Sequence, residues 1–246
     1  MVPKIVHYCW FGNKEIPKKL KQNINSWKEE NPDFNFICWN EKNFDLKSAP
    51  SFVRKAYETQ NWAFVADYVR LYAVYNYGGV YLDTDVELIK KLDIVLTKFP
   101  YGYMGFENSH QINTGLGFSA EKNNVFLKEM MNKYEKIDFD LQNKEAVACP
   151  IINTDILVDN GLILNNKIQV IKGFYILPTE YLCPLELGTG KLKITTNTVS
   201  IHWYNASWMK GMDKIKIKSI MKMKKILPSH LVSFSRKFFR KILKNN

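Results

Sequence analysis

The chain has 246 residues, of which 46% are hydrophobic and 14% aromatic, so it is long and apolar enough to bury a sizeable core. No stretch approaches the roughly 18–20 consecutive apolar residues of a transmembrane helix, which argues against an integral membrane protein. The first residues lack the basic start and apolar run of a secretory signal, and the four cysteines are far apart with no C-x-x-C pair. We therefore expect a cytoplasmic protein without a disulfide framework or a zinc knot.

The formal net charge of +11 is concentrated at one end of the chain. Residues 209–246 hold twelve lysines and arginines and one acid, whereas residues 1–208 hold 23 basic and 23 acidic residues. A nucleic-acid enzyme usually carries its basic surface on the folded body around its site. The neutral body therefore disfavours nucleic acid as a partner, and the charge pattern predicts a folded domain at 1–208 followed by a basic tail at 209–246.

Hydrophobic periodicity and turn residues predict strands that alternate with helices. We expect a strand at 4–10, a helix at 17–30, a strand at 35–40, helices at 51–59 and 61–77, and a strand at 80–82. Farther along we expect strands at 103–107, 115–119, 168–171 and 198–203, with helices at 124–136 and 151–158. This order predicts an α/β fold with a mostly parallel sheet, whose ligands bind at the carboxyl ends of the strands.

The basic tail has the pattern of an amphipathic helix. From Leu231 onward its apolar residues recur at the helical period, and lysines and arginines fall between them. A basic amphipathic helix with phenylalanines on its apolar face is typical of segments that bind an anionic lipid surface. We therefore expect residues 214–244 to attach the protein peripherally to the inner face of the cell membrane. Docking of the tail on the body and binding of nucleic acid are the alternatives.

Two carboxylates, Asp83 and Asp85, directly follow the apolar strand predicted at 80–82. Alternate side chains of a strand point the same way, so we expect the two carboxylates to converge. Converging carboxylates repel each other unless a cation joins them, and oxygen ligands suit Mg²⁺ or Mn²⁺. The alternative is a pair of aspartates that only caps a turn.

The helix predicted at 61–77 is apolar nearly all round and is therefore expected to be buried. Within it Asp67 and Arg70 are three residues apart and share one face. Burying two charged groups is costly unless they pair or contact a ligand. The pattern leaves open a structural ion pair or a site in which Arg70 faces phosphate or sugar hydroxyls and Asp67 holds a sugar hydroxyl.

At this point the sequence resembles glycosyltransferase family 32. The resemblance rests on Ala63 to Arg70 (AFVADYVR), on Tyr77 to Asp85 (YGGVYLDTD), on the opening run from Pro3 to Gly12, and on the closing Ser200–Trp203 with Ser207 and Trp208. It spans roughly residues 2–208. It implies a GT-A fold, a nucleotide-sugar donor, preferably a UDP-sugar, a Mn²⁺ or Mg²⁺ cofactor, and retention of the anomeric configuration.

The resemblance also implies roles for individual residues. Asp85 would coordinate the metal directly, Asp83 would contact the ribose or the metal, and Asp67 and Arg70 would hold the donor sugar. His202 would reach the metal or the diphosphate, although a lone histidine is more often a core residue.

The same resemblance extends to the nucleotide. The turn around Tyr8 and Trp10 would hold the nucleobase, and Ser207 and Trp208 would close over the phosphates. From spacing alone, Trp10 and Trp208 are equally compatible with core aromatics.

Polar residues farther along the chain are candidates for the acceptor side. Asp155 is the first candidate, with Glu107 and Asn113 behind it. The alternative for each is a turn or a helix cap. The predicted function is a metal-dependent retaining glycosyltransferase that extends a lipid-linked glycan in capsule, lipopolysaccharide or other surface polysaccharide synthesis.

Two other interpretations fit part of the pattern. The strand followed by Asp83 and Asp85 also resembles the nucleophile motif of haloacid-dehalogenase-type phosphohydrolases, with Asp155 and Asp159 spaced like a later acid pair. That reading gives no role to Asp67. A non-catalytic adaptor with a basic tail is the second alternative, against which the neutral body and the carboxylates weigh.

Overall fold

The computed structural model describes residues 1–186 and 189–204. In chain order these residues form β1 (Ile5–Cys9), α1 (Lys18–Glu30), β2 (Asn35–Trp39), α2 (Ser51–Glu58), α3 (Trp62–Tyr77), β3 (Gly79–Tyr81), β4 (Val86–Leu88), α4 (Leu92–Lys98), β5 (Gly102–Asn108), β6 (Gln111–Ile112), η1 (Thr114–Leu116), β7 (Phe118–Ala120), α5 (Val125–Lys136), η2 (Lys144–Val147), α6 (Cys149–Asp159), β8 (Gln169–Ile171), β9 (Phe174–Leu177), α7 (Thr179–Leu182) and β10 (Ser200–His202).

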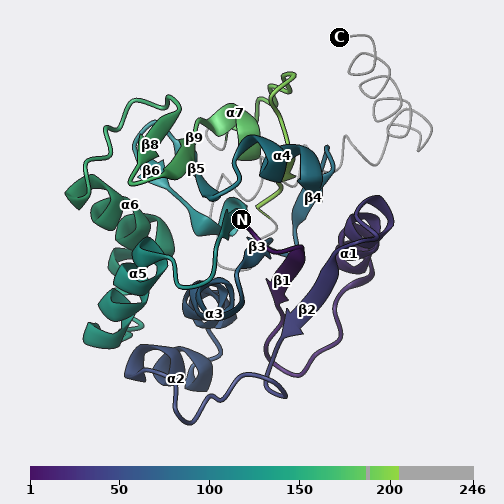
Figure 1. Ribbon diagram of the computed structural model, residues 1–246. Helices are drawn as coiled ribbons and strands as arrows, with labels where there is room; N and C mark the ends of the chain where they lie inside the picture. Colours follow the sequence, from purple (N-terminus) through teal and green to yellow (C-terminus); the bar gives the residue numbers. More distant parts are fainter. Residues whose placement is uncertain (187–188, 205–246) are drawn as a thin grey trace.

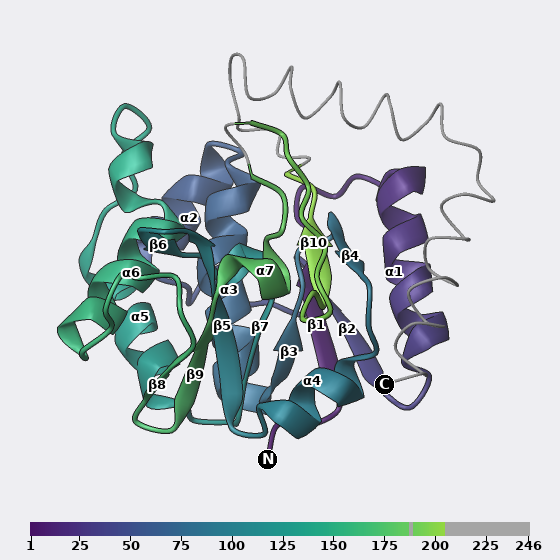
Figure 2. The same ribbon diagram turned by 90° about the horizontal axis from the view of Figure 1, so that it is seen from above.

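The central sheet has the strand order β2-β1-β3-β7-β5-β9-β8, with β6 paired to β5, and β4 and β10 form a separate pair. β1 is parallel to β2 and β3, β7 is antiparallel to β3 and β5, and β9 is parallel to β5. Five strands (β2, β1, β3, β5 and β9) therefore run in one direction, whereas β7 and β8 run in the other. The prediction of a mostly parallel α/β sheet is confirmed, and Figure 2 shows these strands side by side.

Helices cover both faces of the sheet (Figure 1). On one face the largest hydrophobic cluster joins α2, α3, α5 and α6 to the sheet. On the other face Ile24 and Trp27 of α1 pack with Val6 and Val80 of β1 and β3. Because successive strand residues point to opposite faces, the neighbours of these valines face α3 instead. A third cluster joins α4, α7 and β10.

Helix α3 passes through the middle of the core, and ten of its residues are buried. It ends at Gly78 and Gly79, whose φ angles are +66° and +111°. A Cβ atom at Gly79 would lie 2.5 Å from the carbonyl oxygen of Ile5, so the glycine lets β3 begin directly against β1. The predicted helix, its stop signal and the strand that follows are confirmed.

The structure differs from the sequence-based prediction around residues 115–119. Instead of one strand, the 3₁₀ turn η1 is followed by β7. The side chain of Asn113 accepts a hydrogen bond from the backbone N–H of Gly115 (2.6 Å), which competes with strand pairing and stabilises the turn. The short strand β4 was also not predicted, because it exists only through its pairing with the distant β10.

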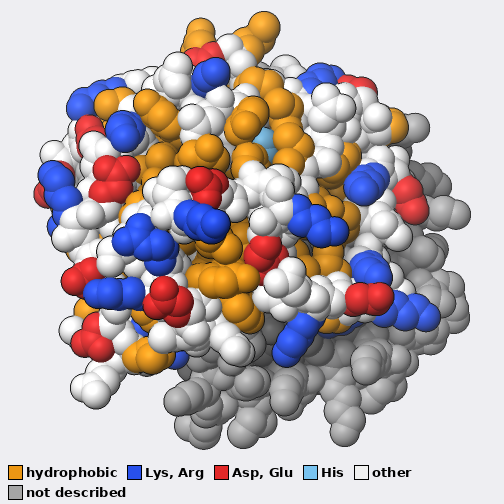
Figure 3. Space-filling view, turned by 90° about the horizontal axis from the view of Figure 1, so that it is seen from below, with side chains coloured by type: hydrophobic (Ala, Val, Ile, Leu, Met, Phe, Trp, Pro, Cys, Tyr) orange, Lys and Arg blue, Asp and Glu red, His pale blue; other side chains and the backbone are white. Residues whose placement is uncertain are grey.

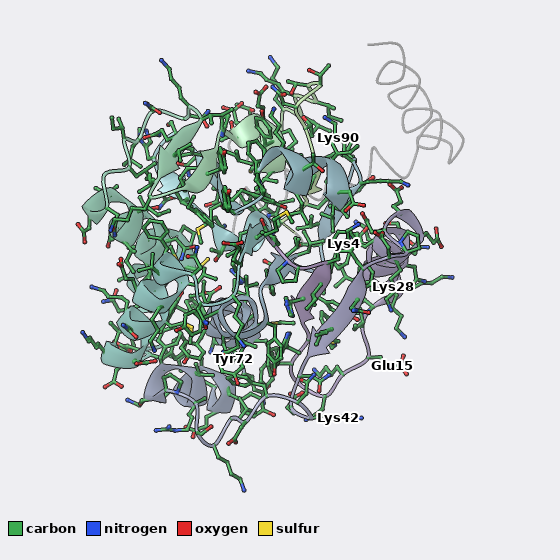
Figure 4. All side chains as sticks on the ribbon, in the orientation of Figure 1. Lys4, Glu15, Lys28, Lys42, Tyr72 and Lys90 are labelled. Atoms are coloured by element: carbon green, nitrogen blue, oxygen red, sulfur yellow. The ribbon has the colours of Figure 1, made fainter. Side chains whose placement is uncertain are left out.

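Charged residues of both signs are interspersed on the face of the molecule seen in Figure 3, in keeping with the neutral composition of residues 1–208. Lys28, Lys42 and Lys90 lie at the periphery in Figure 4. Tyr72 of α3 instead makes edge-to-face contacts with Trp39 and Phe44. The charges of the body therefore surround an aromatic interior.

No helix in the described ranges is long and apolar enough to cross a membrane. The four cysteines are free. The predicted boundary at 208/209 and the membrane-binding segment 214–244 lie outside the described residues.

His7 connects three elements of the core. It is fully buried on β1. Trp39 Nε1–H donates to His7 Nδ1 (3.1 Å), so His7 Nε2 carries the ring proton and donates it to the carbonyl oxygen of Gly78 (2.8 Å). Burial lowers the pKa of His7 from its usual 6.5 to about 4, although the bond to Gly78 opposes this shift.

This geometry predicts a pH-dependent stability. The unfolded chain binds a proton at His7 near pH 6.5, whereas the folded chain binds it only near pH 4. The stability that neutral His7 contributes to the fold is therefore complete above pH 6.5 and is lost as the pH falls from 6.5 toward 4. Between pH 7 and pH 5 we expect the native chain to lose about 2 kcal/mol more free energy of unfolding than His7→Gln, whose amide can keep both hydrogen bonds. Urea unfolding at the two pH values measures this difference. Parallel pH dependence in the two proteins would contradict the prediction.

Candidate active site

Asp83 and Asp85 lie in the turn between β3 and β4. β3 ends at Tyr81, and the backbone N–H of Val86 donates to the carbonyl oxygen of Asp83 (2.9 Å), which closes the turn. The expectation that alternation along a strand aligns the two carboxylates is therefore wrong, because a turn brings them together. β4 pairs antiparallel with β10 so that His202 lies opposite Val86. This pairing carries His202 to the side of Asp85.

Asp83, Asp85 and His202 form a compact cluster. Each offers one ligand atom, and these atoms lie within 4.8 Å of one another. His202 Nε2 is 3.2 Å from Asp85 Oδ1 and 3.8 Å from Asp83 Oδ2. Asp85 and His202 are buried and Asp83 is half-buried. The structure thus brings together the three residues that the sequence analysis selected as metal ligands.

Arg70 links this cluster to helix α3. Its Nη1 is 3.1 Å from Asp67 Oδ1, one turn earlier on the helix, and its Nη2 is 3.1 Å from Asp83 Oδ1. Tyr81 adds a hydroxyl that donates to the same Asp83 oxygen (2.7 Å). Asp67 and Arg70 are therefore not a self-contained ion pair, because the guanidinium also holds a carboxylate of the turn.

Burial and neighbouring charges act together on the site. Burial lowers the pKa of Arg70, but Asp83 and the other anions around it outweigh this and hold it well above its usual range. Burial raises the pKa of Asp67 to about 6, although Arg70 opposes the shift. Burial lowers the pKa of His202, but Asp85 and Asp83 outweigh it and raise the pKa to about 10. The carboxylates thus favour positive charge beside them.

The side chains of the cluster fit a divalent cation. Two carboxylates are ligands that Mg²⁺ and Mn²⁺ share, and an imidazole nitrogen suits a transition metal better than Mg²⁺. The ring of His202 is oriented by edge-on packing against Tyr204, with centroids 4.2 Å apart, and its Nε2 points at the carboxylates. Its buried Nδ1 has no hydrogen-bond partner in the described ranges. The cluster therefore offers two carboxylate ligands and one imidazole ligand.

The opening strand ends at the same edge of the sheet. Tyr8 is buried and packs edge-on against Trp27 of α1. Trp10 is half-buried, and its Nε1–H donates to the carbonyl oxygen of Lys14 (2.6 Å). Because β1 is parallel to β3, Trp10 and Asp83 both follow the carboxyl ends of neighbouring strands. Contact of these aromatics with a nucleobase stays a prediction.

Asp155 does not join the cluster. It is exposed on α6, whereas Asn153 and Thr154 are buried and accept hydrogen bonds from the backbone N–H groups of Thr114 and Ile112. Helical periodicity turns Asp155 about 200° away from Asn153, which explains why the first acceptor-side candidate faces solvent. Ser207 and Trp208 lie outside the described residues.

Three residues around the site were not selected from the sequence. Cys149 is buried with Sγ 3.3 Å from Arg70 Nη1, and nothing in its sequence context marks it. A Cβ atom at Gly115 would lie 2.7 Å from Asp83 Oδ2, so this glycine leaves room for the carboxylate. Tyr81 was predicted only as a strand residue, although its position two residues before Asp83 is compatible with a shared face.

Comparison with known proteins agrees with this geometry. Residues 17–100 match a protein family described as a glycosyltransferase sugar-binding region containing a DXD motif, and the matched stretch includes Asp67, Arg70, Asp83 and Asp85. Inositol phosphoceramide mannosyltransferase 3 of Schizosaccharomyces pombe is 30% identical over 143 residues, which cover 56% of this chain and 39% of that protein. Mannosyl phosphorylinositol ceramide synthase SUR1 of Saccharomyces cerevisiae is 26% identical over 149 residues, which cover 56% and 37%. The chain thus spans about two fifths of the length of these curated relatives.

Among solved structures, the chain is similar to the PaToxG glycosyltransferase, with a TM-score of 0.52 and 19% identity over 64% of this chain and 69% of that one. At this identity the likeness shows the fold, which is of the GT-A type expected from the resemblance. The family match and the named relatives favour a glycosyltransferase over the phosphohydrolase and adaptor interpretations. Asp155 and Asp159, the acid pair of the former, are both exposed on α6.

Gly115 allows a test of the cluster geometry. In Gly115→Ala the new methyl group would contact Asp83 Oδ2 at 2.7 Å and Asn113 Oδ1 at 2.9 Å, so Asp83 must move. We expect Mn²⁺ affinity, measured by calorimetry, to fall about tenfold or more, with a loss of stability of about 1–3 kcal/mol. Gly173→Ala is the control. Its φ of +85° strains an alanine and so costs stability, but no atom lies within 4 Å of the added Cβ, and Mn²⁺ affinity should not change. Equal Mn²⁺ affinity in the native chain and Gly115→Ala would show that Asp83 does not bind the ion.

Proposed function

We propose that this chain is a DXD-containing glycosyltransferase of the family 32 type, which transfers a hexosyl group from a nucleoside diphosphate sugar to a hydroxyl of a glycan acceptor. The observation that carries the proposal is the convergence of Asp83, Asp85 and His202 within 4.8 Å, with Arg70 beside them. The carboxylates of Asp67, Asp83 and Asp85 lie close together and would repel a diphosphate unless a cation lay between them.

Asp85, Asp83 and His202 would hold Mn²⁺ or Mg²⁺. When bound, such an ion binds diphosphate oxygens and neutralises the charge that develops on the leaving group. Arg70 is already fixed through both of its terminal nitrogens by Asp67 and Asp83. Its Nε is buried and, within the part of the chain described, has no hydrogen-bond partner.

The proposal extends to the donor and to the stereochemistry. We propose a UDP-sugar as the first donor class to test. Because both curated relatives are named for mannosyl transfer, mannose nucleotides form the second. Tyr8 and Trp10 would contact the nucleobase, and Ser207 and Trp208 would close over the phosphates.

No side chain of the cluster is an evident covalent nucleophile. Retention would therefore rest on Arg70 and on donor geometry, with the diphosphate accepting the proton of the acceptor hydroxyl.

We further propose that the acceptor is lipid-linked and that the enzyme acts at the cytoplasmic face of the membrane in surface polysaccharide synthesis. Residues 214–244 would bind the anionic lipid surface, which would concentrate enzyme and acceptor in one layer. The neutral composition of residues 1–208 supports a membrane contact through the tail, because the body by itself has no excess charge to attract it to an anionic membrane.

Thermal unfolding tests the nucleotide and metal site. We expect UDP or GDP to stabilise the native chain only when Mn²⁺ is present, by roughly 2.7 kcal/mol at about 100 times the dissociation constant. Asp85→Asn removes one charge at nearly constant volume and should abolish this ligand-dependent shift. Glu29→Gln, an exposed carboxylate of α1, serves as the control and should keep it. If neither nucleotide shifts the transition of the native chain, the proposal is wrong.

Vesicle sedimentation tests the tail. We expect the full chain to sediment with vesicles containing phosphatidylglycerol at low salt and to be released as salt rises, because each basic residue near such a surface contributes about 1 kcal/mol. A chain ending at residue 208 should stay in the supernatant. Binding that survives this deletion would place the membrane contact on the body instead.

A further inference from the structure

A chain of hydrogen bonds leads from Arg70 to a carboxylate outside the metal cluster. Arg70 Nη1–H donates to Cys149 Sγ (3.3 Å), and the thiol donates to Asn113 Oδ1 (3.2 Å). Asn113 Nδ2–H then donates to Glu107 Oε1 (2.9 Å). Each side chain thus donates to the next, from Arg70 to Glu107. The four side chains come from α3, α6, the turn before η1 and the end of β5.

The chemistry of the four side chains gives this chain its direction. Arginine can only donate and an ionised carboxylate can only accept. The amide of Asn113 is oriented by Gly115, whose backbone N–H donates to Oδ1 at 2.6 Å. The thiol of Cys149 must therefore be protonated, since it accepts from Arg70 and donates to Asn113. Burial raises the pKa of this thiol, in agreement with the neutral form.

Glu107 borders the candidate active site on two sides. It stands at the carboxyl end of β5, which runs in the same direction as β3, the strand that leads to Asp83. Asp83 Oδ2 and Asn113 Oδ1 lie 2.7 and 2.9 Å from one point, where a Cβ of Gly115 would be, so they are near neighbours. The ring of Tyr204 packs against His202, and Glu107 is near enough to its hydroxyl to contribute, after burial and Cys183, to the raised pKa of Tyr204.

We infer that Glu107 binds a hydroxyl of the substrate, with Asn113 and Cys149 as positioning residues. The inference rests on the proposed function, because it assumes that a sugar occupies this edge of the sheet. A carboxylate can accept about four hydrogen bonds, and the bond from Asn113 uses one of them. Glu107 is half-buried, so its remaining acceptor positions are accessible. An acceptor-only anion selects a neutral group that donates, such as a sugar hydroxyl, and rejects phosphate.

The hydroxyl belongs either to the donor sugar or to the acceptor, and kinetics separate these sources. The release of nucleoside diphosphate from UDP-glucose, UDP-galactose and GDP-mannose is measured with Mn²⁺, in water alone and with methyl α-D-mannopyranoside. We expect Glu107→Gln to lower the rate about 10- to 100-fold, the effect of losing a hydrogen bond to a charged group. A fall in both conditions assigns the donor sugar, and a fall only in the glycoside-dependent rate assigns the acceptor.

The positioning role of Cys149 has its own readout. Cys149→Ala breaks the chain, and we expect it to lower kcat about tenfold. Cys149→Ser keeps a group that both accepts and donates, and should restore kcat to within about threefold of the native value. Thermal unfolding is measured in parallel, because a purely structural role would make activity follow stability in both variants. Equal losses of kcat in the two variants would overturn the positioning role.

Two measurements keep this inference distinct from the proposed function. Glu107→Gln should retain the Mn²⁺-dependent thermal shift with UDP or GDP, because Glu107 is not among the residues of the metal cluster. Glu58→Gln, an exposed carboxylate of α2, should release nucleotide at the native rate. Unchanged rates in Glu107→Gln beside an active native chain would overturn the inference alone. A native chain without nucleotide binding or release would overturn both.

Discussion

The guanidinium of Arg70 is the interaction on which the site depends. It is buried on α3 and is shared between Asp67 of its own helix and Asp83 of the turn after β3. Removing one partner of such a buried ion pair leaves an uncompensated charge, which is far more costly than losing a surface pair. The planar fork of arginine suits this place because its two terminal nitrogens can face two carboxylates at once, whereas a lysine offers a single point charge.

The backbone around Arg70 is arranged so that distant segments meet there. Gly78 and Gly79 let the chain leave α3 and enter β3 directly against β1, which places the Asp83 turn beside the helix. β4 exists because it pairs with β10, and the same pairing brings His202 to Asp85. On the other side Asn113 shapes η1 and opens the space at Gly115 that Asp83 occupies.

The electrostatics of the site explain why the proposed nucleotide would need the proposed metal ion. The carboxylates of Asp67, Asp83 and Asp85 lie around one guanidinium and one imidazole. A diphosphate that approaches this cluster is repelled by its excess negative charge. A divalent cation bound between them would turn this repulsion into attraction. The GT-A fold alone does not decide the sugar or the acceptor, since function resides in the site and not in the architecture.

The sequence by itself determined the α/β class, the buried helix with its glycine stop, the Asp67/Arg70 pair and the DXD motif, because these features are local patterns of periodicity, turn chemistry and charge spacing. Family resemblance added His202, whose role no spacing reveals. The tertiary structure alone decided that a turn aligns Asp83 and Asp85, that Asp155 faces solvent while Asn153 faces inward, and that Cys149 joins Arg70 to Asn113. The contacts of Cys149 with Arg70 and Asn113 link residues that are far apart in the chain. Their geometry therefore depends on strand pairing and on helix packing, which a local pattern does not encode.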